Sequence, residues 1–188
     1  MPLLEDQALG PAIEVVLEAR RCPSLAWWAH HNLLVRDAEP LPEQIGLPPG
    51  WQGPQARAWF GVILQADSLG GLWGRTHWLL SVGGHPHLIH LGPPTPTLRR
   101  RAALLDALLR ARGNAAPAHG LQGRPAVPGD PWPPVQPWQI HPLSLQTLRE
   151  EVAQLERQLD SPLPPSSHSR PVGRCWDCPA CARCRAAA

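Results

Sequence analysis

The sequence predicts an α/β fold: a small mixed β-sheet flanked by helices and closed by a cysteine-rich metal site at the C-terminus. Three observations predict it. Two segments, 97–112 and 144–159, carry leucines at helical spacing. Short apolar runs between residues 59 and 91 are divided by Gly-Gly pairs, as the strands of a sheet are. Four of the five cysteines lie within residues 175–184.

Length and composition favour one domain over residues 1–188. An apolar content of 43% is ordinary for a globular protein, and the net charge is only +2. All 17 basic residues are arginine, which excludes any mechanism that needs a lysine ammonium. The N-terminus has no basic segment of a signal peptide, and no apolar run approaches the roughly 20 residues of a membrane span. We therefore expect a cytoplasmic protein with no membrane partner.

The first third of the chain predicts two short helices and a loop. In segment 8–19, apolar residues fall on one helical face: Leu9, Ile13, Val16 and Leu17. A second helix is expected over 24–34, with Ser24 as its N-cap. A Pro- and Gly-rich loop follows over 38–56.

The middle predicts a hairpin-rich sheet and then a helix. Strands are expected within 59–65, 72–82 and 87–91, divided by the glycine pairs 70–71 and 83–84, of which the second predicts a hairpin turn. The helix 97–112 should end at Gly113-Asn114.

The last third predicts one helix between irregular segments. Residues 115–142 are rich in proline and predict a surface loop. The helix 144–159 should begin with Ser144 as its N-cap. A flexible linker, 161–174, then leads to a cluster-binding tail, 175–184.

The cysteine tail predicts a metal centre. Cys175, Cys178, Cys181 and Cys184 recur every three residues, a density that thiolate ligation explains better than packing. Zinc is one alternative, but zinc ribbons usually separate their two CxxC pairs by about 15–20 residues. A free cysteine-rich tail is the other. A 4Fe-4S cubane fits better, because closely spaced loops commonly give three thiolates and a distant cysteine the fourth. Cys22 is the only other cysteine, so we favour Cys22 with three of the tail cysteines.

This arrangement resembles the iron–sulfur RecB-like exonucleases, including CRISPR-associated ones, of the PD-(D/E)XK nuclease superfamily. Cys175, Cys178 and Cys184 match the family's C-x2-C-x5-C spacing, and Cys181 is a possible additional ligand. The resemblance implies an iron–sulfur cluster, DNA as the partner, and a complex with other DNA-processing proteins. Segment 74–94 resembles the family's strand–hairpin–strand, and helix 97–112 its next helix.

The family's catalytic residues are not matched. The resemblance puts metal-binding acids at positions 77 and 90 and a lysine at 92, where this chain has His77, His90 and Gly92. It therefore implies a degenerate site in a DNA-binding or assembly component. One alternative is an active exonuclease in which Asp67 and Asp106 converge with His77. The other is a small iron–sulfur electron carrier.

Three further groups have two interpretations each. The hairpin histidines His77, His85, His87 and His90 are either a metal site or, as we favour, surface residues. Arg99, Arg100 and Arg101 either contact DNA phosphates or form a solvated helix end. The tryptophans in regular elements are expected to be mostly core rather than base-stacking residues, namely Trp27, Trp28, Trp59, Trp73 and Trp78.

Overall fold

The computed structural model describes residues 10–31, 56–91, 94–114, 119–123 and 136–165. The α-helices in these ranges are α1 (Ile13–Arg21), α2 (Pro23–His30), α3 (Pro96–Ala111) and α4 (Leu145–Leu159). The strands are β1 (Ala56–Phe60), β2 (Ile63–Ala66), β3 (Leu72–Arg75), β4 (Trp78–Val82), β5 (His85–Leu91), β6 (His119–Gly123) and β7 (Gln136–Gln139). A short 3-10 turn, η2 (Asp67–Leu69), lies between β2 and β3.

The main sheet is mixed, as predicted. Its five strands run in the order β1-β4-β5-β6-β7. The first three pair antiparallel, β6 runs parallel to β5, and β7 runs antiparallel to β6. Helix α3 makes the crossover that a parallel pair requires. The α/β fold class is thus confirmed.

Two of the three predicted strand runs, 59–65 and 72–82, are each divided between two sheets. Strands β2 and β3 form a separate antiparallel hairpin. Gly61, with φ of 61°, separates β1 from β2, and Thr76 with His77 separates β3 from β4. The two crossing segments are hydrogen-bonded to each other, because Thr76 N donates to the Val62 carbonyl and Gly61 N to the His77 carbonyl. His77 therefore stands at the junction of the two sheets.

The hairpin turn predicted at the second glycine pair is confirmed. Gly83 and Gly84 join β4 to β5 with φ of 56° and 85°. A two-residue hairpin turn with both φ values positive favours glycine at both positions. The turn fixes the register in which Trp78 pairs with Ile89.

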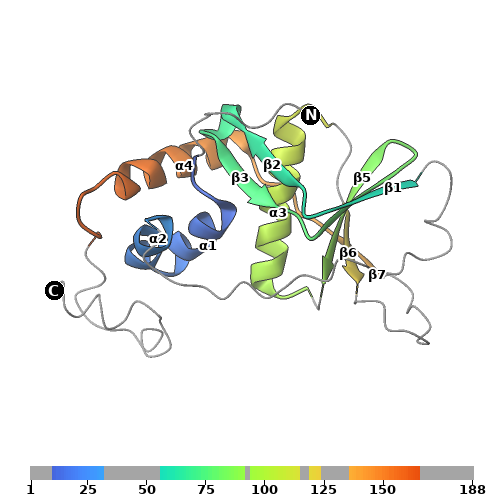
Figure 1. The fold of residues 1–188 in the computed structure, drawn as a ribbon, viewed down its shortest axis with the longest axis horizontal. Helices are drawn as coiled ribbons and strands as arrows, with labels where there is room; N and C mark the ends of the chain where they lie inside the picture. The colour runs from blue at the N-terminus through green and yellow to red at the C-terminus, as the bar shows by residue number, and fades with distance from the viewer. Residues whose placement is uncertain (1–9, 32–55, 92–93, 115–118, 124–135, 166–188) are drawn as a thin grey trace.

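Helix α3 lies at the centre of the molecule, with the five-stranded sheet on one side and α1, α2 and α4 on the other (Figure 1). Eight consecutive residues, 102–109, are buried. The Thr95 hydroxyl accepts from Leu98 N at 3.2 Å and begins the helix. Gly113, with φ of 85°, ends it as predicted. Within the described residues, α3 packs on the five-stranded sheet through β5 and on the β2–β3 hairpin, so "flanked by helices" holds for one side of the five-stranded sheet.

Helix α4 agrees with the prediction, whereas α1 begins five residues later than expected and α2 ends four residues earlier. Ser144 caps α4, accepting from Thr147 N at 3.3 Å. Helix α1 buries Ile13 and Val16 as expected, while Leu9 lies outside the described residues. Cys22, rather than Ser24, occupies the N-cap position of α2. Pro23 follows at the first helical position, where its fixed φ is suited to starting a helix.

The prediction of a loop over 115–142 was wrong in part. Strands β6 and β7 lie within it and complete the sheet. Gly120 of β6 faces Trp138 of β7, and a Cβ on it would lie 2.4 Å from the indole ring. A glycine that looks like loop composition thus makes room for a tryptophan. The loop expected over 38–56 lies outside the described residues, apart from Ala56 in β1.

Within the described residues, no helix has a stretch that is long and apolar enough to cross a membrane.

Candidate functional site

The two strands β4 and β5 bring His77 and His90 together. The antiparallel register pairs Trp78 with Ile89, so the positions just outside that pair, 77 and 90, lie opposite each other. The two imidazole centroids are 5.8 Å apart. These are the positions at which the sequence resemblance puts the two metal-binding acids.

His90 is almost wholly buried, with 1% of its surface exposed. Neither of its ring nitrogens, Nδ1 or Nε2, has a hydrogen-bond partner among the described residues. Its ring also contacts Trp138, at 5.6 Å between centroids. The prediction of surface histidines is therefore wrong for His90, because strand alternation turns its side chain into the interior. It is correct for His85, which is exposed beside the turn.

Both histidines are neutral at physiological pH. Burial lowers the pKa of His90 to about 3, with further lowering by His77 and Arg101. Burial likewise lowers the pKa of His77 to about 4, and Arg101 lowers it further. Each ring therefore offers one N–H donor and one nitrogen acceptor.

Arg101 lies beside this pair and links three elements. Its Nη2 donates to the Arg75 carbonyl at the end of β3 and to Glu14 Oε1 of α1, the latter at 3.3 Å. Its Nη1 is buried, and no described residue forms a hydrogen bond with it. Sequence reasoning missed Glu14, since nothing in the sequence links it to a residue 87 positions away.

The other two arginines of the predicted DNA-binding group have different surroundings. Arg100 donates to Glu151 Oε2 of α4 at 3.0 Å, and Glu151 also pairs with Arg20. Burial, with Arg20 nearby, lowers the pKa of Arg100. Arg99 is exposed, and its guanidinium carbon lies 5.3 Å from the Trp138 ring centroid. Arg99 is thus the member of the group that faces solvent.

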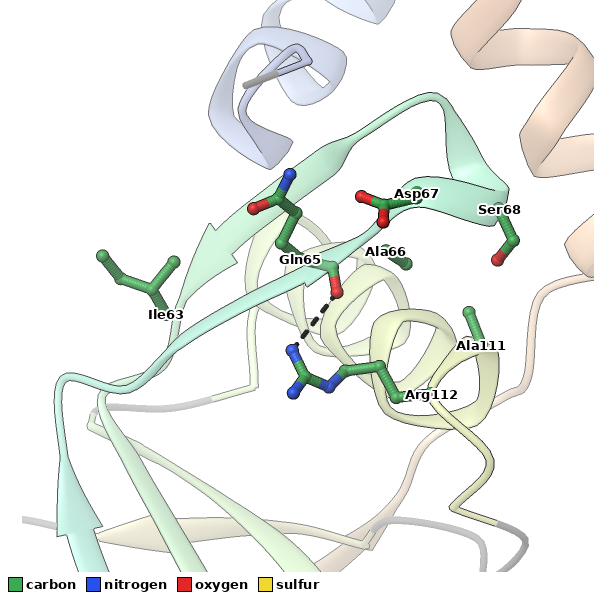
Figure 2. A pocket seen from close by; sticks show the side chains of 7 residues that line it. All are labelled: Ile63, Gln65, Ala66, Asp67, Ser68, Ala111 and Arg112. Atoms are coloured by element: carbon green, nitrogen blue, oxygen red, sulfur yellow. Dashed lines mark hydrogen bonds between the residues drawn. The ribbon is translucent and has the colours of Figure 1, made fainter. Parts of the chain in front are cut away.

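The two acids that would restore a catalytic site do not join His77. Asp67 lines an open cavity of about 500 Å³ at the C-terminal end of α3, together with Ser68 and Arg112. Figure 2 shows this cavity, in which Arg112 donates to the Gln65 carbonyl at 3.4 Å. Because Arg112 is eleven residues beyond Arg101, the two positions are about 16 Å apart along the helix axis.

Asp106, the second acid, pairs with Arg110 of the same helix at 2.8 Å. Its side chain is 4% exposed. Arg110 also donates to the Leu143 carbonyl, again at 2.8 Å, and so ties α3 to the start of α4. Asp106 is therefore part of a buried structural ion pair.

Cys22 stands where α1 meets α2, is half-buried, and forms no disulfide with another described residue. Helix α2 holds the segment that leads toward the cysteine tail. Trp27 Nε1 donates to the Ser161 carbonyl at 2.8 Å, and the Ser24 hydroxyl donates to the Pro165 carbonyl. A His31 ring nitrogen lies 3.1 Å from the Leu159 carbonyl oxygen. Part of the predicted linker 161–174 is therefore docked on α2.

The tail ligands lie outside the described residues, namely Cys175, Cys178, Cys181 and Cys184. Within the described part of the chain, no group of three or more histidine, cysteine or acidic side chains is arranged to hold a metal ion. Of the tryptophans, Trp27 is buried as predicted, whereas Trp59 is 43% exposed, contrary to the core assignment.

The chain matches no protein-family profile and no curated protein. Among solved structures, one titled "Crystal structure of SSO0001" aligns with a TM-score of 0.37 and 14% sequence identity. The alignment covers 70% of this chain and 61% of that one, so the chain spans about three-fifths of that structure's length.

Proposed function

We propose that this chain is a RecB-like iron–sulfur protein with a degenerate nuclease site. It acts in DNA processing as a DNA-binding or assembly component, in a reducing, cytoplasmic compartment. Its cluster ligands are Cys22, Cys175, Cys178 and Cys184. The observation that carries the proposal is the docking of residues 159–165 on α2, the helix whose N-cap is Cys22.

That docking makes the proposed ligand set reachable. Pro165 is hydrogen-bonded to Ser24, which is two residues from Cys22. Cys175 lies ten positions after Pro165, and ten residues of extended chain span up to about 33–36 Å. Cys22 itself is half-buried and stands at the N-cap of α2, the helix on which the segment before the tail is docked. When bound, a 4Fe-4S cluster supplies a cross-link between the N-terminal helices and the tail.

The sheet supports the nuclease-family part of the proposal. A hairpin of β4 and β5 followed directly by α3 is the order that the resemblance implies. The two histidines at the expected acid positions face each other across that hairpin. Hydrolysis that uses Mg²⁺ needs anionic oxygen ligands, and imidazoles are a poor replacement for them. We therefore expect DNA binding without metal-dependent cleavage.

Iron content tests the cluster. Anaerobically purified protein should be brown and contain about four irons per chain. Cys22→Ala should lose iron as completely as Cys175→Ala, whereas the matched control Cys181→Ala should keep it. Stoichiometric zinc without iron would overturn the cluster. Essential Cys181 with dispensable Cys22 would indicate a ferredoxin-like ligand set, as an electron carrier has.

Cleavage assays test the degenerate site. Single- and double-stranded DNA should remain intact with Mg²⁺ or Mn²⁺, because no carboxylate stands at position 77 or 90. Cleavage that disappears in Asp67→Ala or His77→Ala protein would instead establish an active exonuclease.

A further inference from the structure

Two neighbouring side chains, His90 and Arg101, keep buried polar atoms that no described residue satisfies. Both ring nitrogens of His90 and Nη1 of Arg101 have no hydrogen bond among the described residues. A buried donor or acceptor without a partner costs free energy, so folded proteins rarely keep several together. Such unpartnered atoms are explained when a ligand, an ion or a water molecule forms the missing hydrogen bonds. His90 is 1% exposed, and its side chain points into the group that His77 and Arg101 also form.

Charge decides what kind of ligand fits. Arg101 is close enough to lower the pKa of both His77 and His90, so its positive potential reaches both rings. The same potential repels a cation and attracts an anion. No carboxylate contributes to either histidine's pKa shift. Glu14, the nearby acid, is held at Nη2 of Arg101, which leaves Nη1 to the interior.

We propose that His77, His90 and Arg101 bind one phosphate oxyanion directly, without a metal ion. The neutral His90 imidazole donates one N–H, the His77 ring lies beside it, and the guanidinium adds a charge-assisted hydrogen bond. The Arg101 guanidinium is ion-paired with Glu14 through Nη2, and its Nη1 is the nitrogen left to donate to a phosphate oxygen. The N–H groups of the protein thus bind the phosphate directly. A pair of carboxylates at positions 77 and 90 would instead need a divalent cation to bind it.

The surroundings favour a phosphate within a nucleic acid over a free phosphate. Trp138 contacts His90 on one side and lies under the guanidinium of Arg99 on the other. A largely apolar cavity of about 250 Å³ adjoins it, lined in part by Arg99, Ala103, Trp138 and Ile140. An apolar cavity beside an aromatic ring and an exposed arginine suits a base of a single strand next to the bound phosphate. This choice of source rests on the proposed function, whereas the oxyanion site does not.

Two measurements on the full iron-containing chain test the site, both at fixed ionic strength and without divalent metal. In the first, inorganic phosphate is titrated while the histidine ring resonances are followed by NMR. The resonances of His77 and His90 should shift and saturate, and a single-stranded oligonucleotide should compete. In the second, fluorescence anisotropy measures the affinity for that oligonucleotide. His77→Ala and His90→Leu should each weaken binding about tenfold, and the matched control His85→Ala should not.

Each contrary result has a defined meaning. Ring resonances unchanged by phosphate would overturn the oxyanion site, even if the protein still holds iron and binds DNA through Arg99. Saturable binding of Zn²⁺ that His90→Leu abolishes would make the site a cation site and overturn the proposal. A phosphate response without competition by oligonucleotide would keep the oxyanion site and overturn its assignment to nucleic acid.

Discussion

The buried polar groups at the two ends of α3 differ in whether they are hydrogen-bonded. At the C-terminal end, Asp106 is paired with Arg110, Arg110 also donates to the Leu143 carbonyl, and the Asn114 amide donates to the Leu109 carbonyl. At the N-terminal end, Arg101 and the adjacent His90 keep buried nitrogens without a partner among the described residues. A buried polar group that is satisfied stabilises the fold, and one that is not destabilises it. The polar groups at the C-terminal end of α3 therefore stabilise the fold, whereas those at the N-terminal end leave nitrogens that a ligand can bind.

The largest effect on stability should come from removing the ion pair between Asp106 and Arg110. Asp106→Leu leaves the Arg110 guanidinium, 24% exposed, without its carboxylate. Removing one partner of a largely buried ion pair typically costs about 3 kcal/mol. We expect the free energy of unfolding in urea to fall by that amount. Asp67→Leu, an exposed acid at the neighbouring cavity, is the control and should change it by less than about 0.5 kcal/mol. Equal losses of unfolding free energy in the two variants would mean that the Asp106–Arg110 ion pair does not stabilise the fold.

An intermediate effect should appear on acidification. The pKa of His90 is lowered to about 3 and that of His77 to about 4, below the unfolded value of 6.5. Above pH 6.5 both states are neutral and the histidines do not affect stability. As pH falls below 6.5, the two histidines bind protons in the unfolded chain but stay neutral in the folded chain. Stability should then fall, by about 2 kcal/mol for His90 alone between pH 6.5 and 5.

Urea unfolding at half-unit pH intervals measures this slope. The window from pH 6.5 to 5 lies mostly above the titration of ordinary carboxylates. His90→Leu should lower the slope by about one proton's worth, about 1.4 kcal/mol per pH unit. A slope unchanged in that variant would mean that His90 is already protonated or solvated in the folded chain.

Local signals account for what the sequence predicted well. Helices α3 and α4 begin and end within one residue of the predicted bounds, because their leucine spacing and the caps Thr95 and Ser144 act within a few residues. The glycine pair 83–84 likewise predicted its hairpin turn, since a positive φ is a property of single positions.

Long-range pairing accounts for what it missed. Strands β6 and β7 are short and contain glycine or proline, and they become strands because the β5 edge is there to pair with. The burial of His90 depends on Trp138, 48 positions away, and that of Arg101 on Glu14. The candidate site is an outcome of tertiary structure, so residue types alone predicted His77 and His90 as positions but not their burial.

The smallest effect, and the one that separates the two ends most clearly, is a gain in stability. His90→Leu replaces a buried ring with two unpartnered nitrogens by an apolar side chain of similar size. Removing such groups from an interior should raise the free energy of unfolding by about 1 kcal/mol at pH 7.5. The control His85→Leu, at an exposed position on the same strand, should leave it unchanged. A variant that is more stable than the natural chain yet binds phosphate less tightly is the behaviour of a residue kept for function. A loss as large as that of Asp106→Leu would mean that His90 is satisfied in the folded protein. The two ends of α3 would then be alike, and the oxyanion site would lose its main support.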